Sequence, residues 1–193
     1  MDKTGYWHQS SCYVRNNRNR HEKSRMKRIA ILPARGGSKR IPRKNIKDFH
    51  GRPLIAYALN AAKKSNVFDT IHVSTDDDEI TQVVSDLGFP PDFKRPDNLA
   101  DDTTPMFDVY KHTVKTYLQQ GISFDTICVI FPTAPLINPV DLQKAAKQFE
   151  QTDGTRILMS VTEYPAPLEW SFRKNPGNNH LKAIHNGGFL KRS

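Results

Sequence analysis

The sequence predicts an α/β fold with a mostly parallel sheet. Three observations support this prediction. From Lys27 onward, short apolar runs alternate with segments of helical periodicity. A loop rich in glycine and positive charge follows the first apolar run directly, at the place where ligands collect in such sheets. No apolar run approaches the roughly 20 residues that a membrane-spanning helix needs.

The elements follow from these patterns in chain order. Ile29 to Leu32 is a buried-strand pattern, and the next segment has proline in its first turn and an apolar face that includes Leu54 and Ala58. Four acids crowd the start of a later helix, where they oppose the positive end of its dipole. We expect strands at 28–33, 70–74, 126–131 and 156–162, a short extended piece around Phe93, and helices at about 53–64, 76–87, 105–120 and 139–150.

Residues 1–26 have no periodicity and few aliphatic side chains, which predicts a disordered basic extension. This segment is either a basic arm for RNA or an acidic surface, or an upstream-extended start before Met26. The formal net charge of +9 is concentrated in residues 1–52, so it does not indicate a domain that binds nucleic acid throughout. We therefore expect no nucleic-acid partner.

The N-terminus lacks the apolar segment of a signal peptide, so we expect no membrane partner and a cytoplasmic location. Cys12 and Cys128 are too few for a disulfide framework, and no Cys/His cluster has the spacing of a zinc site. Both cysteines are therefore expected to be free thiols, with Cys128 buried in a strand.

The loop after the first strand has the composition of a polyphosphate site. Gly36 and Gly37 allow the backbone to turn its N–H groups toward an anion, and Ser38 and Asn45 add neutral donors. Five cations accompany them: Arg35, Lys39, Arg40, Arg43 and Lys44. Neither the P-loop spacing nor the dinucleotide-binding glycine pattern is present. Acidic and Pro-Thr segments at 76–79 and 132–135 follow two other strands, so we expect all three loops to meet.

Five blocks of the sequence resemble the acylneuraminate cytidylyltransferases, the CMP-sialic acid synthetase family, in the family's order: 34–45, 73–80, 95–103, 130–136 and 160–163. The resemblance implies that residues 27–193 form a cytidylyltransferase domain with a three-layer Rossmann-like nucleotide-diphospho-sugar transferase fold. It also implies that CMP moves from CTP to the anomeric hydroxyl of a nine-carbon acidic sugar, with release of pyrophosphate. The partners would then be CTP and the acidic sugar.

The resemblance also implies roles for individual residues. Arg35 and Lys44 would act on the triphosphate as catalytic residues, whereas Thr133 and Ser160 would border the acceptor sugar. The nucleotide-binding set would be Leu32, Ala34, Arg35, Gly36, Gly37, Ser38, Lys39, Lys44, Asn45, Asp76 and Arg95. Plainer readings stay open for several residues, because Arg95 can pair with Asp97 or Asp101, and Asp77, Asp78 and Glu79 are explained as helix N-terminal charges.

Two departures from the family pattern refine this interpretation. Phe131 and Ile137 stand where CMP-sialic acid synthetases usually carry Gln and Arg, which favours the pseudaminic acid cytidylyltransferase branch. The sequence also ends before the family's C-terminal segment, where the resemblance places the ligands of Mg²⁺, so no metal residue is assigned. The resemblance therefore does not imply turnover by this form, and we expect the full-length form to be a homodimer. The alternatives are a CTP-binding protein without turnover and a Kdo-type cytidylyltransferase.

Overall fold

A five-stranded sheet organises the computed structural model, which describes residues 11–15, 26–152, 157–161, 172–174, 177 and 181–183. The strand order is β5-β2-β6-β1-β7. Strand β2 (Arg28–Pro33) runs parallel to β5 (Thr70–Ser74) on one side and to β6 (Thr126–Ile130) on the other. The three central strands therefore end at the same edge of the sheet, as the sequence predicts.

Strand β1, the fourth in the spatial order of the sheet, was not expected from the sequence. Strand β1 (Ser11–Arg15) lies antiparallel to β6, with Cys12 opposite Val129, and the short β7 (Leu158–Met159) pairs with the far side of β1. The prediction of disorder is therefore wrong for these five residues, because the edge of β6 offers them a hydrogen-bonding partner that local periodicity does not reveal. The rest of residues 1–25 lies outside the described residues. The strand predicted at 156–162 is reduced to β7, and residues 156 and 162 also lie outside them.

Four helices begin and end close to their predicted bounds: α1 (Leu54–Ser65), α2 (Asp78–Asp86), α3 (Met106–Gln119) and α4 (Pro139–Glu150). Asn138 caps α4 by accepting a hydrogen bond from the Asp141 N–H at 3.0 Å, and proline occupies the first turn of this helix. The extended piece predicted around Phe93 is not a strand. A 3₁₀ turn, η2 (Asp97–Leu99), follows it instead.

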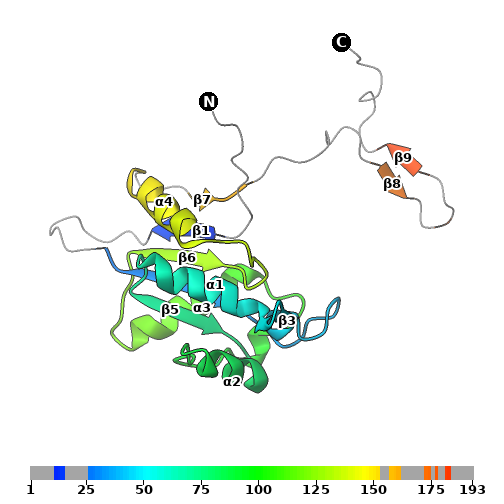
Figure 1. Cartoon of the computed structure of the whole chain (residues 1–193), viewed down its shortest axis with the longest axis horizontal. Coiled ribbons are helices and arrows are strands. Elements are labelled where there is room, and N and C mark those ends of the chain that lie inside the picture. Colours follow the sequence, from blue (N-terminus) through cyan, green and yellow to red (C-terminus); the bar gives the residue numbers. More distant parts are fainter. Residues whose placement is uncertain are drawn as a thin grey trace, which may run out of the picture. The chain divides into compact units, whose positions relative to one another are not determined.

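The two faces of β2 enter different apolar cores, which gives the fold its three layers. Ala30 and Leu32 pack with residues of α1, α2 and α4, whereas Ile29 and Ile31 pack with Tyr117 of α3 and its neighbours. Figure 1 shows α1 and α4 side by side over one face of the sheet, joined by a hydrogen bond from the Gln143 amide to the Ser65 carbonyl at 3.0 Å. The period-two alternation of a strand accounts for this division, and the predicted three-layer α/β fold is confirmed.

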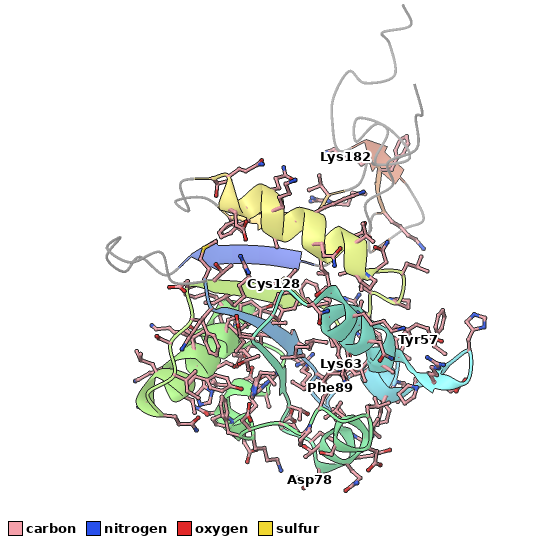
Figure 2. All side chains as sticks on the ribbon, turned by 60° about the vertical axis from the view of Figure 1, so that its left-hand side comes forward. Tyr57, Lys63, Asp78, Phe89, Cys128 and Lys182 are labelled. Carbon is pink, nitrogen blue, oxygen red and sulfur yellow. The ribbon has the colours of Figure 1, made fainter. Side chains whose placement is uncertain are left out.

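The smaller elements extend the loops. A 3₁₀ turn, η1 (Lys44–Ile46), and a hairpin of β3 (Asp48–Phe49) and β4 (Arg52–Pro53) connect β2 to α1. Residues 8–160 form one compact unit, and a second unit contains residues 1–7 and 161–193, within which β8 (Phe172–Lys174) and β9 (Leu181–Ala183) form a hairpin. Among the described helices, none has the length and apolar character required to cross a membrane. Cys128 is fully buried in β6, as expected (Figure 2).

Candidate functional site

A cleft of about 470 Å³ opens beyond the carboxyl ends of β2 and β6. Its walls come from the loop after β2, from η1, from the segment before α3 and from the loop after β6. The lining residues are Pro33, Arg35, Ser38, Lys39, Arg40, Ile41, Lys44, Asn45, Arg95, Asp102, Met106, Phe131, Pro132 and Thr133. Two of the three loops that the sequence places together therefore form one cavity.

The charge of the cleft is strongly unbalanced. Arginine and lysine side chains come from five lining positions, whereas Asp102 is the one carboxylate among the lining residues that the structure describes. Within the described part of the chain, neither Arg40 nor Lys44 pairs with a carboxylate. A site with this excess of fixed positive charge suits a ligand with several negative charges.

Asp102 lies between two of these cations. Its carboxylate is 2.6 Å from Arg35 Nη2 and also pairs with Lys39, while Arg35 Nη1 donates to the Asp101 carbonyl oxygen at 2.7 Å. Hydrogen bonds from Lys39 and then from Arg35 hold the pKa of Asp102 below its usual range. The guanidinium of Arg35 is thus fixed by two groups of the same short loop.

The turn that carries Asp102 is itself well ordered by Asp101. The Asp101 carboxylate accepts hydrogen bonds from the backbone N–H groups of Thr103 and Thr104, at 2.8 and 2.6 Å, and from both hydroxyls. These bonds, led by that of the Thr104 hydroxyl, lower the pKa of Asp101 to about 2. The side chain of Asp101 therefore shapes the loop, and that of Asp102 reaches the cleft.

Gly36 is required for close packing. A Cβ atom at this position would lie within 2.9 Å of the Asp77 Cβ, and closer still to the Asp77 carboxylate, whereas one at Gly37 would meet nothing within 4 Å. The Gly36 N–H donates to the Asp76 carboxylate at 3.3 Å. Neither glycine is among the described residues with positive φ. Glycine is needed at position 36 because a side chain would not fit there, and not because of an unusual backbone angle.

The start of α2 is fastened to the same loop. Asp77 is the N-cap of this helix and accepts from the Ile80 N–H at 3.0 Å, with Asp78 and Glu79 in the first turn. Arg43, at φ 55°, pairs with both Asp77 and Glu79. The helix N-terminal interpretation of these acids is confirmed, and Arg43 is turned toward α2 and away from the lining of the cleft. Figure 2 labels Asp78, the first residue of α2.

Two nearly buried polar side chains form the floor beside β2. Asn45 donates from Nδ2 to the Arg35 carbonyl oxygen at 3.1 Å, which holds the start of the loop in place. Arg95 is 3% exposed and donates to Ser74, from Nε to Oγ at 3.1 Å and from Nη2 to the carbonyl oxygen at 2.6 Å. It pairs with neither Asp97 nor Asp101, so that reading of Arg95 is wrong. Burial lowers the pKa of Arg95.

The structure brings many of the predicted site residues together. Seven line the cleft: Arg35, Ser38, Lys39, Lys44, Asn45, Arg95 and Thr133. Leu32 and Ala34 are fully buried beneath it, and Gly36, Gly37 and Asp76 belong to the adjoining loops without lining it. Ser160 follows β7 and does not line the cleft either.

Sequence reasoning missed the acid and the apolar wall of the cleft. Asp102 belongs to the Leu-Ala-Asp-Asp run, but nothing in that run shows that its second Asp faces the loop after β2. Met106 and Phe131 are 39% and 41% exposed, although they are large apolar residues, and both line the cavity. Met106 directly follows Pro105, and Phe131 directly follows the end of β6. These positions at loop boundaries were the available signal that both residues could face a ligand.

Comparisons with known proteins find similarity over most of the chain. The family model described as cytidylyltransferase matches residues 29–170. A pseudaminic acid cytidylyltransferase from Campylobacter jejuni subsp. jejuni serotype O:2 is 40% identical over 153 residues, covering 79% of this chain and 66% of the relative. An N-acylneuraminate cytidylyltransferase from Escherichia coli O18:K1:H7 is 31% identical over 146 residues, covering 75% of this chain and 33% of the relative.

A solved structure is similar as well. A cytidylyltransferase from Leptospira borgpetersenii serovar Hardjo-bovis superposes with a TM-score of 0.55 at 25% identity, covering 67% of this chain and 51% of that chain. In each of these comparisons, the matched region spans less than two thirds of the relative's own length.

Proposed function

This chain belongs to the cytidylyltransferase family, and from that membership and the basic cleft we propose that it moves CMP from CTP to a nine-carbon acidic sugar. The anomeric hydroxyl of the sugar attacks the α-phosphorus of CTP. The bond from this phosphorus to the bridging oxygen then breaks, and pyrophosphate leaves. The hydroxyl releases its proton to solvent as the new oxygen–phosphorus bond forms, so the products are a CMP-sugar, pyrophosphate and a proton.

One observation carries the proposal: five cations line a single cleft at the carboxyl ends of two parallel strands. Phosphoryl and nucleotidyl transfer depend mainly on positioning and on neutralising the charge of the phosphates. Arg35 is held by the loop of residues 101–102 and can offer a preorganised fork of donors, and Lys44 is an unpaired cation within the described residues. We assign these two side chains to the triphosphate.

The apolar part of the lining supports an acceptor with apolar substituents. Phe131 and Met106 are partly exposed apolar side chains that line the cleft, as Thr133 also does. Apolar side chains contribute to affinity only where the ligand also buries apolar area. This favours pseudaminic acid, whose sugar tail is deoxygenated, as the acceptor, and the similarity to a protein named for that substrate supports the same choice.

Mg²⁺ is part of the proposal, but the described residues show no cluster of three or more protein ligands for it. No group of three or more His, Cys, Asp or Glu side chains in the described part of the chain could hold a metal ion. The lining carboxylate, Asp102, is already paired with Arg35 and Lys39. We therefore derive no step through the metal and assign the charge neutralisation described here to the cleft cations.

Two further features complete the proposal. CTP is supplied in the cytoplasm, so we place the reaction there, and we propose a homodimer on the basis of the family resemblance. Both are separable from the chemistry of the cleft, because every residue assigned above comes from the unit formed by residues 8–160.

Calorimetric titration of the purified chain tests the proposal. We expect CTP to bind more tightly than ATP or GTP. Replacing Arg35 with Ala should weaken CTP binding by about tenfold or more, because a hydrogen bond between charged groups contributes about 1.5 to 3 kcal/mol. Arg52→Ala removes an equal charge from the exposed hairpin outside the cleft and is the matched control. Equal affinity for all nucleotides would contradict the cytidylyl assignment.

A further inference from the structure

Arg35, which we assign to the triphosphate, and Lys39, another cation of the cleft, are already bound to an anion of the protein itself. The Asp102 carboxylate lies 2.6 Å from Arg35 Nη2 and also pairs with Lys39. The Lys39 side chain is 82% exposed, and side chains with this exposure are usually held only weakly by an ion pair. Both oxygens of the carboxylate are used, Oδ1 by Arg35 and Oδ2 by Lys39. The carboxylate thus occupies a position between two cations that a phosphate group would also occupy.

The loop that carries Asp102 is itself held in one conformation by hydrogen bonds. Asp101 closes the turn with bonds to Thr103 and Thr104, and its own carbonyl oxygen accepts a second hydrogen bond from Arg35. Asp102 therefore does not approach the cations as a freely moving side chain. Its side chain is nevertheless 37% exposed, so a competing anion in solution can reach it and replace it.

We propose that Asp102 is a latch, a carboxylate that holds Arg35 and Lys39 in place until the phosphates of a nucleotide replace it. The inference rests on the proposed function, because it takes the nucleotide triphosphate as the competing anion. Replacement converts two protein ion pairs into two ion pairs with phosphate, so the cations stay oriented before and after binding.

The latch has a consequence for ligand selection. A ligand must replace both ion pairs of Asp102, which favours an anion that can contact Arg35 and Lys39 together. A triphosphate can span the two cations, whereas a neutral nucleoside cannot compete for either. Asp102 therefore lowers the affinity for every polyphosphate and leaves the binding of the base unaffected.

The magnitude of this effect follows from the exposure of the pairs. Solvent-exposed ion pairs contribute little individually, so we expect the two contacts to weaken polyphosphate binding by about three- to tenfold. Asp102→Asn removes the negative charge at almost constant volume and should strengthen binding by that factor. Asp102→Glu keeps the charge and should remain within about twofold of the unchanged protein.

The test is calorimetric titration of the unchanged chain, Asp102→Asn and Asp102→Glu with CTP and with inorganic triphosphate, in EDTA so that no metal bridges the anion. Asp108→Asn is the matched control, since it removes one negative charge from the exposed first turn of α3, outside the lining of the cleft. We expect both ligands to bind Asp102→Asn more tightly, with no such gain in Asp108→Asn. Asp102→Ala provides a second charge-removing variant if the amide alters the loop.

The outcomes separate the latch from the proposed function. If inorganic triphosphate binds Asp102→Asn more tightly but CTP is not preferred over ATP, the latch stands and the cytidylyl proposal fails. If CTP is preferred but neither charge-removing variant binds polyphosphate more tightly, the latch is wrong. An equal gain in Asp108→Asn would reduce the effect to general electrostatics and would also overturn the latch, as would failure of every variant to bind triphosphate.

Discussion

Around the cleft, the sign of a residue's charge does not by itself determine its role. Arg43 has the charge expected of a phosphate ligand, yet it pairs with Asp77 and Glu79 and fastens the loop to α2. Asp102 has the charge expected to repel a phosphate, yet it holds two of the cations. The composition of the loop therefore identifies the site, whereas the role of each charge depends on partners from distant parts of the sequence.

Gly36 gives the clearest prediction at the scale of one residue. Gly36→Ala should lower the free energy of unfolding by about 1 to 3 kcal/mol, because the new methyl group would displace Asp77 from its capping position. Urea unfolding followed by circular dichroism measures this difference.

Gly37→Ala is the matched control for that substitution. Its Cβ would enter open space, so its free energy of unfolding should stay within about 0.5 kcal/mol of the unchanged protein. Equal effects of the two substitutions would show that Gly36 is not in close contact with the start of α2.

The elements most local in sequence were the most predictable. The bounds of α4 and β5 match those expected from periodicity and proline position, and α1 differs by one residue at each end. Strand β1 was missed, because its partner β6 lies more than 100 residues away. For the same reason sequence patterns placed Arg35 and Lys39 in the site but could not show that Asp102 faces them. Long-range pairing depends on the whole fold and leaves little local signal.

The packing of β5 against α3 carries a prediction on pH. His72 of β5 is 1% exposed, and its Nδ1 lies 3.2 Å from the Tyr117 hydroxyl of α3. Its Nε2 has no hydrogen-bond partner among the described residues. Burial lowers the pKa of His72 to about 4, against the opposing charge of Asp92. Between about pH 6.5 and 4 the unfolded chain therefore binds the proton more readily, so the free energy of unfolding falls as the pH falls.

His72→Phe should remove this dependence. Between pH 7 and 5, the free energy of unfolding of the unchanged protein should drop by about 2 kcal/mol more than that of the variant. Urea unfolding at each pH measures the difference. His50→Asn, in the exposed turn between β3 and β4, is the control and should follow the unchanged protein. Parallel pH profiles of His72→Phe and the unchanged protein would show that His72 is not the group concerned.

At the scale of the whole molecule, the basic cleft can be compared with another hollow that the described residues of the 8–160 unit form at a different place. The basic cleft lies beyond the carboxyl ends of β2 and β6. The other hollow, of about 420 Å³, is lined by residues at the start of β5 and after α2, including Asp69, Gly88 and Phe89. The Lys63 ammonium lies over the Phe89 ring, at 5.5 Å from its centroid (Figure 2). Only the first combines strand ends, a glycine-containing loop and an excess of cations among the described residues, and the account therefore assigns the nucleotide to it.

The most direct test of that assignment is to map the CTP site by nuclear magnetic resonance. In a titration of ¹⁵N-labelled protein with CTP, the account predicts that amide shifts change in residues 35–45, in the turn at 101–104 and at Thr133. It also predicts little change at residues 88–92, beside the other hollow. Changes concentrated at residues 88–92, or absent from residues 35–45 at saturating CTP, would contradict the central claim that the cleft beyond β2 is the nucleotide site.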